Sequence, residues 1–117
     1  MLILKVVNKK TIIDAKYNES VLQILTKQFG ECIYEFHYRF EFISKGQIPN
    51  FAFVLLAGQV VLINDRKMKF LLDRGSVFGL NELKKNLPSS WDCIVEKNTQ
   101  LLMVEKKIST SLIPPYS

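Results

Sequence analysis

The chain has 117 residues, of which 48% are hydrophobic, and its 16 lysines and arginines against 11 acidic residues give a net charge of +5. This length suits one domain with a single core and no separate output module, so we expect the chain to act through a partner or a ligand. The single histidine and two cysteines are too few for a histidine-rich metal centre, and no metal or cofactor is expected.

The positive charges are spread along the sequence and do not form one patch. They lie at Lys9–Lys10, Arg66–Lys69, Lys84–Lys85 and Lys106–Lys107. No helix-turn-helix pattern accompanies them, so we interpret the charge as a solvated surface and expect no nucleic-acid partner.

The N-terminal residues Met1–Leu4 are apolar, but Lys5 and then Asn8–Lys10 interrupt them. This run is too short for a membrane span or a secretory signal. Its alternation of apolar residues fits an edge strand weakly and a helix no worse. Without a signal peptide, Cys32 and Cys93 are expected to be reduced, buried thiols of a cytoplasmic protein.

The next segment has the pattern of an amphipathic helix. Asn18 or Ser20 can cap it, with Ser20 and Gln23 at capping-box spacing, and Gly30 is a natural terminator. Its apolar stripe consists of Val21, Leu22, Leu25 and Phe29. We expect this helix to lie against one face of the β-structure that follows.

From Cys32 to Phe42 the residues alternate between aromatic or apolar and mostly polar. The pattern predicts one long strand whose aromatic face fills the core. His37 falls on the polar face and is expected at the surface.

A series of short β-prone runs follows, and each run is bounded by turn residues. The runs are residues 40–43, 51–56, 59–63, 70–72, 93–95 and 101–104. Their near-regular spacing predicts a mainly β protein with short helices, as in a double-stranded β-helix or jelly-roll-like β-roll. Gly58, inside an apolar stretch, indicates a bend or bulge, and Asp73–Gly75 a tight turn.

One more helix of one or two turns is expected over Leu80–Asn86, ended by Pro88. We therefore divide the chain into an N-terminal arm and helix packed on the roll (1–30), the β-roll itself (31–108) and a frayed C-terminal tail (109–117).

Gly46 and Gly58, followed by the string from Leu71 to Gly79, resemble the cyclic-nucleotide-binding domain family. The resemblance covers roughly residues 39–106. It implies a small β-roll in which a short helix follows the segment Val77–Gly79.

In that family the segment aligned with Phe78 to Cys93 receives the cyclic phosphate on the backbone amides at a helix start, an arrangement that suits anions. A glutamate after the Phe-Gly pair bonds the ribose, and an arginine after the helix pairs with the phosphate. Here Leu80 stands at the first position, and Pro88, Ser89 or Ser90 at the second, with no arginine after Arg74. A shifted register could bring in Glu82, and Lys84 or Lys85 could supply a point charge without the guanidinium fork.

The resemblance therefore implies a vestigial ligand pocket, and no catalytic residue is expected. The residues assigned to the pocket are Phe78, Gly79, Leu80, Asn81, Glu82, Ser89 and Ser90. Trp91 is expected to pack near the pocket mouth, the alternative being stacking on a base.

These observations favour a degenerate member of the family, a non-catalytic regulatory or scaffolding module acting through a protein partner or as a homodimer. We expect no tight cyclic-nucleotide binding. The alternative is a genuine sensor of a cyclic mono- or dinucleotide or another small anion.

Overall fold

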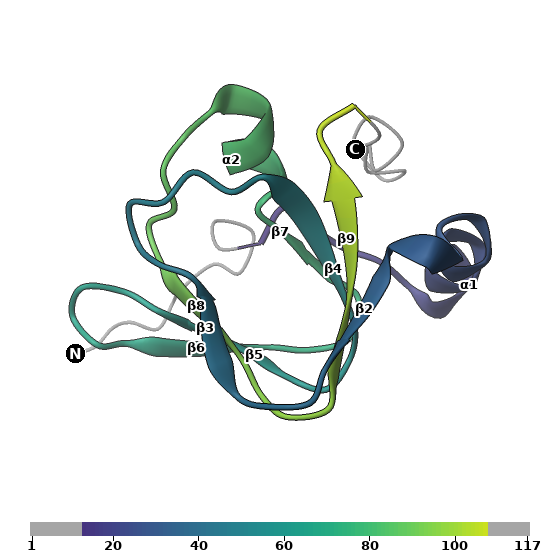
Figure 1. Cartoon of the computed structure of the whole chain (residues 1–117), viewed down its shortest axis with the longest axis horizontal. Helices are drawn as coiled ribbons and strands as arrows, with labels where there is room; N and C mark the ends of the chain where they lie inside the picture. The colour runs from purple at the N-terminus through teal and green to yellow at the C-terminus, as the bar shows by residue number, and fades with distance from the viewer. Residues whose placement is uncertain (1–12, 108–117) are drawn as a thin grey trace.

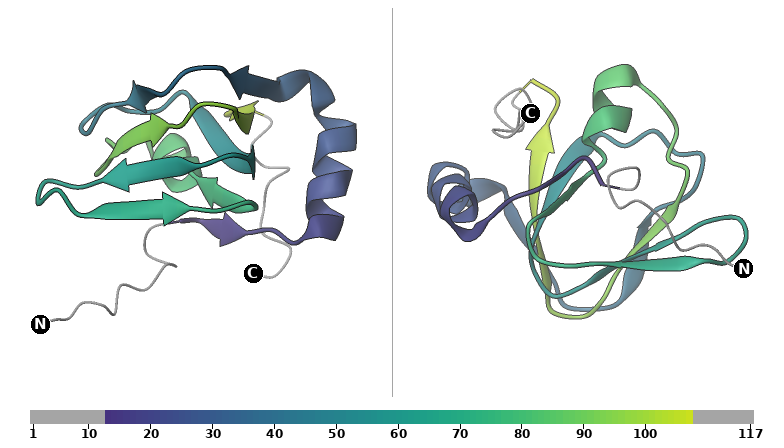
Figure 2. Two further views of the ribbon diagram at one scale, coloured as in Figure 1. Left: turned by 90° about the horizontal axis from the view of Figure 1, so that it is seen from below. Right: turned by 180° about the vertical axis from the view of Figure 1, so that it is seen from behind.

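The computed structural model describes residues 13–107, which form two antiparallel sheets wrapped into a roll (Figure 1). The five-stranded sheet has the order β1-β7-β4-β9-β2, and the four-stranded sheet has the order β3-β8-β5-β6. Helix α1 (Glu19–Gln28) lies outside the five-stranded sheet, and α2 (Leu80–Lys85) lies at one end of the roll (Figures 1 and 2). The expected mainly β-roll with an N-terminal helix is confirmed.

The strands follow the apolar runs of the sequence closely. They are β1 Ala15–Lys16, β2 Ile33–Phe36, β3 Phe40–Ile43, β4 Phe51–Ala57, β5 Val60–Ile63, β6 Lys69–Leu72, β7 Ser76–Phe78, β8 Asp92–Val95 and β9 Thr99–Glu105, with a short 3-10 turn at Gly30–Cys32 before β2. The short pairings of β1 and β7 were not predicted as strands, because two- and three-residue segments carry almost no periodicity.

The central strand β4 is apolar on both faces because both faces are covered. Phe53 and Leu55 point into the roll, where they join an inner cluster with residues of both sheets. Ala52, Val54 and Leu56 point outward into an outer cluster, which α1 and α2 cover. A strand that is buried on both faces has a continuous apolar sequence, and Phe51–Ala57 shows this pattern.

Helix α1 begins at Asn18, whose side-chain oxygen accepts a hydrogen bond from the Val21 amide at 3.0 Å. Asn18 is therefore the cap, and the alternative capping box at Ser20 is wrong, since Ser20 lies inside the first turn. Leu22 and Leu25 are buried in the outer cluster. The predicted packing of the helix on the β-structure is confirmed.

Arg74, in the turn between β6 and β7, fastens the start of α1 to the roll. Its guanidinium binds both carboxylate oxygens of Glu19, at 2.6 and 2.8 Å, and also donates to the Leu56 carbonyl. A bidentate pair of this kind fixes orientation as well as charge.

The expected single strand over Cys32–Phe42 is wrong. The chain turns at residues 37–39, so that β2 joins one sheet and β3 the other. His37 is exposed as expected. Tyr38, expected in the core, is 79% exposed because it lies on this turn.

No helix among residues 13–107 is long and apolar enough to cross a membrane. The expectations for the N-terminal run and for the C-terminal tail concern residues outside the described part of the chain. Cys32 packs against the outer cluster and Cys93 lies in the inner one, and both are free thiols.

Replacing the helix cap should cost stability. We expect Asn18→Ala to lower the free energy of unfolding by about 1 kcal/mol, because it leaves the Val21 amide without its acceptor. Ser20→Ala is the matched control and should change it by less than about 0.5 kcal/mol. Urea unfolding of the unchanged protein and the two variants measures both values. Equal losses of stability in the two variants would mean that Asn18 is not the cap.

Two glycines with similar positive φ angles allow the cost of close packing to be separated from the cost of backbone strain. Gly46 and Gly75 both have φ above +90°, but an added Cβ meets nothing at Gly46, whereas at Gly75 it would fall on the Tyr17 carbonyl oxygen. Gly46→Ala should therefore cost only the backbone strain of about 1–2 kcal/mol. Gly75→Ala should cost clearly more, roughly 3 kcal/mol or above, in thermal or urea unfolding. Similar losses at the two sites would argue against this tight approach of β1 to the turn.

Candidate functional site

The hollow at the predicted pocket lies where β7 passes into α2, and β8 and the loop after β3 form its other walls. Its lining consists of Ile43, Pro49, Leu62, Phe78, Gly79, Glu82, Ser89, Trp91 and Cys93. The hollow has a volume of about 20 Å³, which is room for about one water molecule.

Four of the seven residues assigned to the pocket line this hollow, namely Phe78, Gly79, Glu82 and Ser89. Leu80 is buried in the outer cluster, and Asn81 and Ser90 are exposed. For Leu80 and Asn81 the reason is the helical repeat, which turns each side chain about 100° from the one before it, whereas Ser90 lies beyond the end of α2.

Leu80 and Leu83 are three residues apart and both join the outer cluster, on the same face of α2. Glu82 is thereby left facing the hollow. The acidic residue that a shifted register could supply is indeed at the hollow, whereas the position directly after the Phe-Gly pair points elsewhere.

Aromatic rings fill the interior beyond the hollow. Phe53 and Phe78 stack with their ring centres 5.1 Å apart, and Phe42 meets both edge-on, at 5.2 and 6.2 Å. Close-packed rings of this kind form a core rather than a ligand chamber.

The hydroxyl group at the hollow is already engaged in hydrogen bonds. The Ser89 hydroxyl donates to the Trp91 carbonyl at 2.6 Å and accepts from the Trp91 amide at 3.1 Å. The Trp91 ring meets Phe70 edge-on at 5.2 Å. Trp91 thus packs against the wall of the hollow, which was the first of its two expected roles.

The electrostatics of the hollow disfavour an anion. No lysine or arginine belongs to its lining, and Glu82 contributes a carboxyl group. Burial raises the pKa of the Cys93 thiol to about 12, and the neighbouring Glu82 carboxylate adds to the rise. Cys93 is therefore a neutral thiol at physiological pH and no activated nucleophile.

None of the three arginines lines the hollow. Arg74 is bound to Glu19, and Arg39 donates to Glu96 at 3.0 Å. Arg66 lies in the tight turn between β5 and β6. Lys84 and Lys85 are exposed on α2 and are not part of the lining.

The structure adds one residue that sequence reasoning missed. Asp14, directly before β1, accepts a hydrogen bond from the Leu80 amide at 2.9 Å on its carboxylate. Its own amide donates to the Val77 carbonyl at 2.7 Å, which aligns it with the end of β7. No local pattern could have indicated this contact, because it joins residues 66 positions apart and depends on the pairing of β1 with β7.

Burial dominates the electrostatics of Asp14 and raises the pKa of its carboxyl group to about 6. The Leu80 amide opposes this rise, the Glu82 carboxylate adds to it, and the Asn81 amide and Lys84 reduce it. Above pH 6 the start of α2 therefore holds an anion that belongs to the chain itself.

Among residues 13–107 no group of three or more histidine, cysteine and acidic side chains could hold a metal ion. The hollow thus presents one carboxyl group, one neutral thiol and an engaged hydroxyl. This set offers hydrogen bonds to a water molecule but no positive charge for a phosphate.

No protein-family model matches the sequence, and no curated protein matches it significantly. Solved structures do resemble it in fold. One is the structure described as "A cyclic-GMP-dependent signalling pathway regulates bacterial phytopathogenesis", with a TM-score of 0.71, 17% identity, and coverage of 84% of this chain and 80% of the other.

The catabolite activator protein of Thermus thermophilus gives a TM-score of 0.64 at 17% identity, over 82% of this chain and 46% of that protein. The cAMP-bound PfPKA-R structure gives a TM-score of 0.61 at 17% identity, over 85% of this chain and 36% of the other. The chain spans less than half the length of these two structures. The arrangement of its strands and of α2 is that of a cyclic-nucleotide-binding-like fold.

Proposed function

We propose that this chain is a non-catalytic regulatory or scaffolding module that has lost tight binding of cyclic nucleotides and acts through contacts with a protein partner or a second copy. The observation that carries the proposal is the Asp14 carboxylate on the Leu80 amide, at 2.9 Å. The Asp14 carboxylate thus occupies the amide at the helix start, where the family that this chain resembles binds the cyclic phosphate. We place the module in the cytoplasm.

A phosphate approaching α2 would meet two acidic groups, whereas Lys84, the basic side chain that acts on Asp14, is exposed and lies outside the lining of the hollow. Asp14 is ionised above pH 6, and Glu82 faces the adjoining hollow. An arginine–phosphate contact contributes about 1.5–3 kcal/mol, so the lack of an arginine alone weakens binding by roughly ten- to a hundredfold. Displacing Asp14 would add a further cost.

The same residues argue against catalysis. The buried thiol of Cys93 is protonated, and the one histidine, His37, is exposed on a turn far along the chain from the hollow. A nucleophile needs a base within hydrogen-bond reach, and the lining of the hollow contains neither a histidine nor a lysine.

A sensor of a small ligand is the second candidate, and Glu82 favours it. This carboxyl group reaches the hollow and could accept a hydrogen bond from a ribose hydroxyl. A ligand would have to open the stacked rings of Phe53 and Phe78 or bind across the mouth. Stabilisation of the protein by a nucleotide would select this candidate.

Cyclic nucleotides should leave the stability of the protein unchanged. Thermal unfolding with 1 mM cAMP, cGMP or cyclic di-GMP is expected to give the midpoint of the unliganded protein. A ligand present at a hundred times its dissociation constant would add about 2.7 kcal/mol, which raises the midpoint by several degrees. Such a rise with any of the three compounds contradicts the proposed loss of binding.

Asp14 should make stability depend on pH in a defined direction. Because the pKa of Asp14 rises from 3.8 to about 6 on folding, the native state binds its proton more tightly. The resulting stabilisation is complete below pH 3.8 and is lost as the pH rises through 6. We expect the free energy of unfolding, measured relative to Asp14→Asn, to fall by about 2–3 kcal/mol between pH 4 and 7.

Asp14→Asn is the suitable reference because its amide oxygen can still accept the Leu80 hydrogen bond without titrating. Urea unfolding of both proteins at pH 4, 5, 6 and 7 cancels the contributions of the other acidic groups. A difference that stays constant with pH would mean that Asp14 is solvated like an ordinary surface carboxylate.

A further inference from the structure

In the described part of the chain, the two sheets are not joined by strand pairing along the seam between β2 and β3. These strands follow each other in the chain, yet β2 ends the five-stranded sheet and β3 ends the four-stranded sheet. Each has one hydrogen-bonded neighbour within residues 13–107, β9 for β2 and β8 for β3. Two strand edges that lack a strand partner on one side thus lie on either side of the turn at residues 37–39 (Figure 1).

Aromatic side chains that face into the roll are exposed at this seam. Tyr34 stands opposite Leu101, and Phe40 stands opposite Val95. Residues opposite each other in antiparallel strands share a face, and Leu101 and Val95 belong to the inner cluster. Tyr34 and Phe40 therefore point inward, yet they are 49% and 47% exposed.

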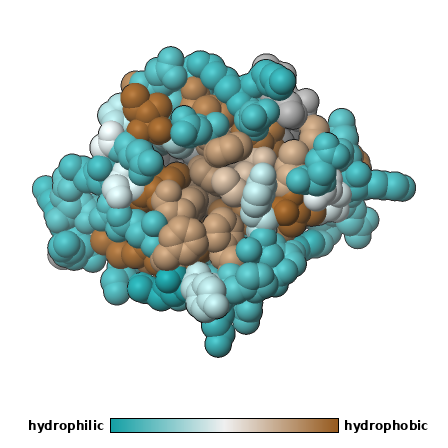
Figure 3. Space-filling model, in the orientation of Figure 1, coloured by the Kyte–Doolittle hydropathy of each residue, from teal (hydrophilic) through white to brown (hydrophobic). Residues whose placement is uncertain are grey.

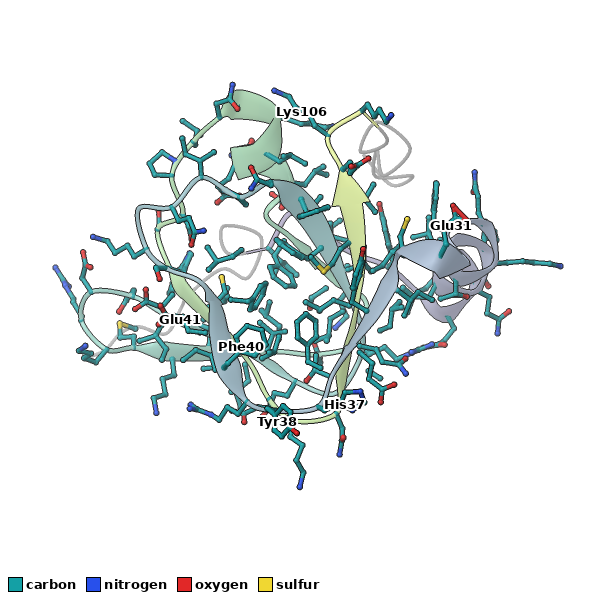
Figure 4. The ribbon with its side chains drawn as sticks, in the orientation of Figure 1. Glu31, His37, Tyr38, Phe40, Glu41 and Lys106 are labelled. Carbon is teal, nitrogen blue, oxygen red and sulfur yellow. The ribbon has the colours of Figure 1, made fainter. Side chains whose placement is uncertain are left out.

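The apolar floor of the seam is continuous with the core. The Phe36 ring lies 5.5 Å from the Phe40 ring and 6.2 Å from the Phe42 ring, which in turn contacts Phe53. Figure 3 shows apolar surface in the middle of this face with a hydrophilic rim. In Figure 4 Phe40 lies by the seam, while Tyr38 and His37 lie on the turn that joins the two strands.

An open edge of this kind favours an added strand. It combines a strand edge that lacks a strand partner with an apolar surface for alternate side chains, the two requirements for β-strand addition. Exposed apolar surface next to a polar rim is also typical of contact sites.

The rim of the seam is acidic. Glu31, Glu35 and Glu41 are exposed along it, and Glu31 and Glu41 lie on opposite sides of the seam (Figure 4). The basic residue of this stretch, Arg39, is bound to Glu96. A complementary segment should therefore be apolar at alternate positions and positively charged.

The N-terminal residues 1–10 have this composition. Leu2, Leu4 and Val6 stand at alternate positions with Ile3, Lys5 and Val7 between them, and residues 1–10 carry Lys5, Lys9 and Lys10 with no acidic residue. Six residues, 2–7, are a common strand length. We propose that residues 2–7 of one copy add a strand to the seam between β2 and β3 of a second copy. This proposal rests on the self-association named in the proposed function.

The reach of the segment favours a second copy over the chain's own seam. Ile13 packs against the inner cluster beside β1, which is at the opposite edge of the five-stranded sheet from β2. Four strand spacings separate these edges, or about 19 Å. Six Cα–Cα steps link Val7 to Ile13 and span at most about 20–22 Å, so only a fully extended, straight link could reach the chain's own seam. The inner cluster fills the direct way through the roll.

Two full-length variants test the exchange. Leu4→Glu should spoil the donated segment and leave the seam intact, whereas Phe40→Glu should spoil the seam and leave the segment intact. Light scattering after size-exclusion chromatography should give a dimer for the unchanged chain at 100 µM and monomers for each variant alone. An equimolar mixture of the two variants should regain dimers, because the Phe40→Glu chain can donate to the Leu4→Glu chain.

Circular dichroism and thermal unfolding verify that both variants are folded, and Ile24→Glu on the exposed face of α1 is the matched control, expected to remain dimeric. A monomer for the unchanged chain, or dimers in both single variants, overturns the proposal. A dimer that neither variant disrupts leaves self-association standing and rejects this seam as its site. Failure of the proposed function would instead appear as stabilisation by a cyclic nucleotide.

Discussion

The contact between the Asp14 carboxylate and the start of α2 sets the electrostatics of the candidate site. It joins the segment before β1 to the helix that follows β7, and it supplies a negative charge to amides that have no partner within the helix. A helix of one and a half turns keeps its first amides available only if nothing nearby satisfies them. Here the chain satisfies them itself, at the cost of burying a carboxyl group whose pKa rises as a result.

Most of the fold could be predicted from the sequence because its strands are separated by turns with clear chemistry. Asp73–Gly75 and Asn64–Asp65 mark two of them, and Asn64 indeed accepts hydrogen bonds from the Arg66 and Met68 amides. The bend expected at Gly58 is also present, at φ +84°, where an added Cβ would collide with Thr99.

The single strand expected over Cys32–Phe42 is wrong because strand alternation does not reveal where a chain changes sheets. Tyr34, Phe36, Phe40 and Phe42 alternate as one strand would, and all four do face inward. The turn at residues 37–39 breaks the strand without a glycine or a proline, so no local signal marked it. At the site, the family resemblance indicated Phe78, Gly79, Glu82 and Ser89 at the hollow, but the burial of Leu80 and the contact with Asp14 arise from tertiary packing.

The inner cluster fills the interior of the roll, and Asp14 occupies the amide at the start of α2. Stacked Phe53 and Phe78 close the chamber from within, and the exposed aromatic residues lie along the seam rather than around the hollow. This distribution of apolar surface is the basis on which we propose contacts with other chains rather than enclosure of a small molecule.

The central claim, that Asp14 holds the amides at the start of α2, can be measured directly by amide NMR. The nitrogen and proton shifts of Leu80 and Asn81 should titrate together with a midpoint near pH 6, and this titration should vanish in Asp14→Asn. At pH 7 they should not move on addition of 1 mM cGMP. Leu80 and Asn81 amide shifts that do not change with pH in the unchanged protein, or that change on addition of the nucleotide, would contradict the claim.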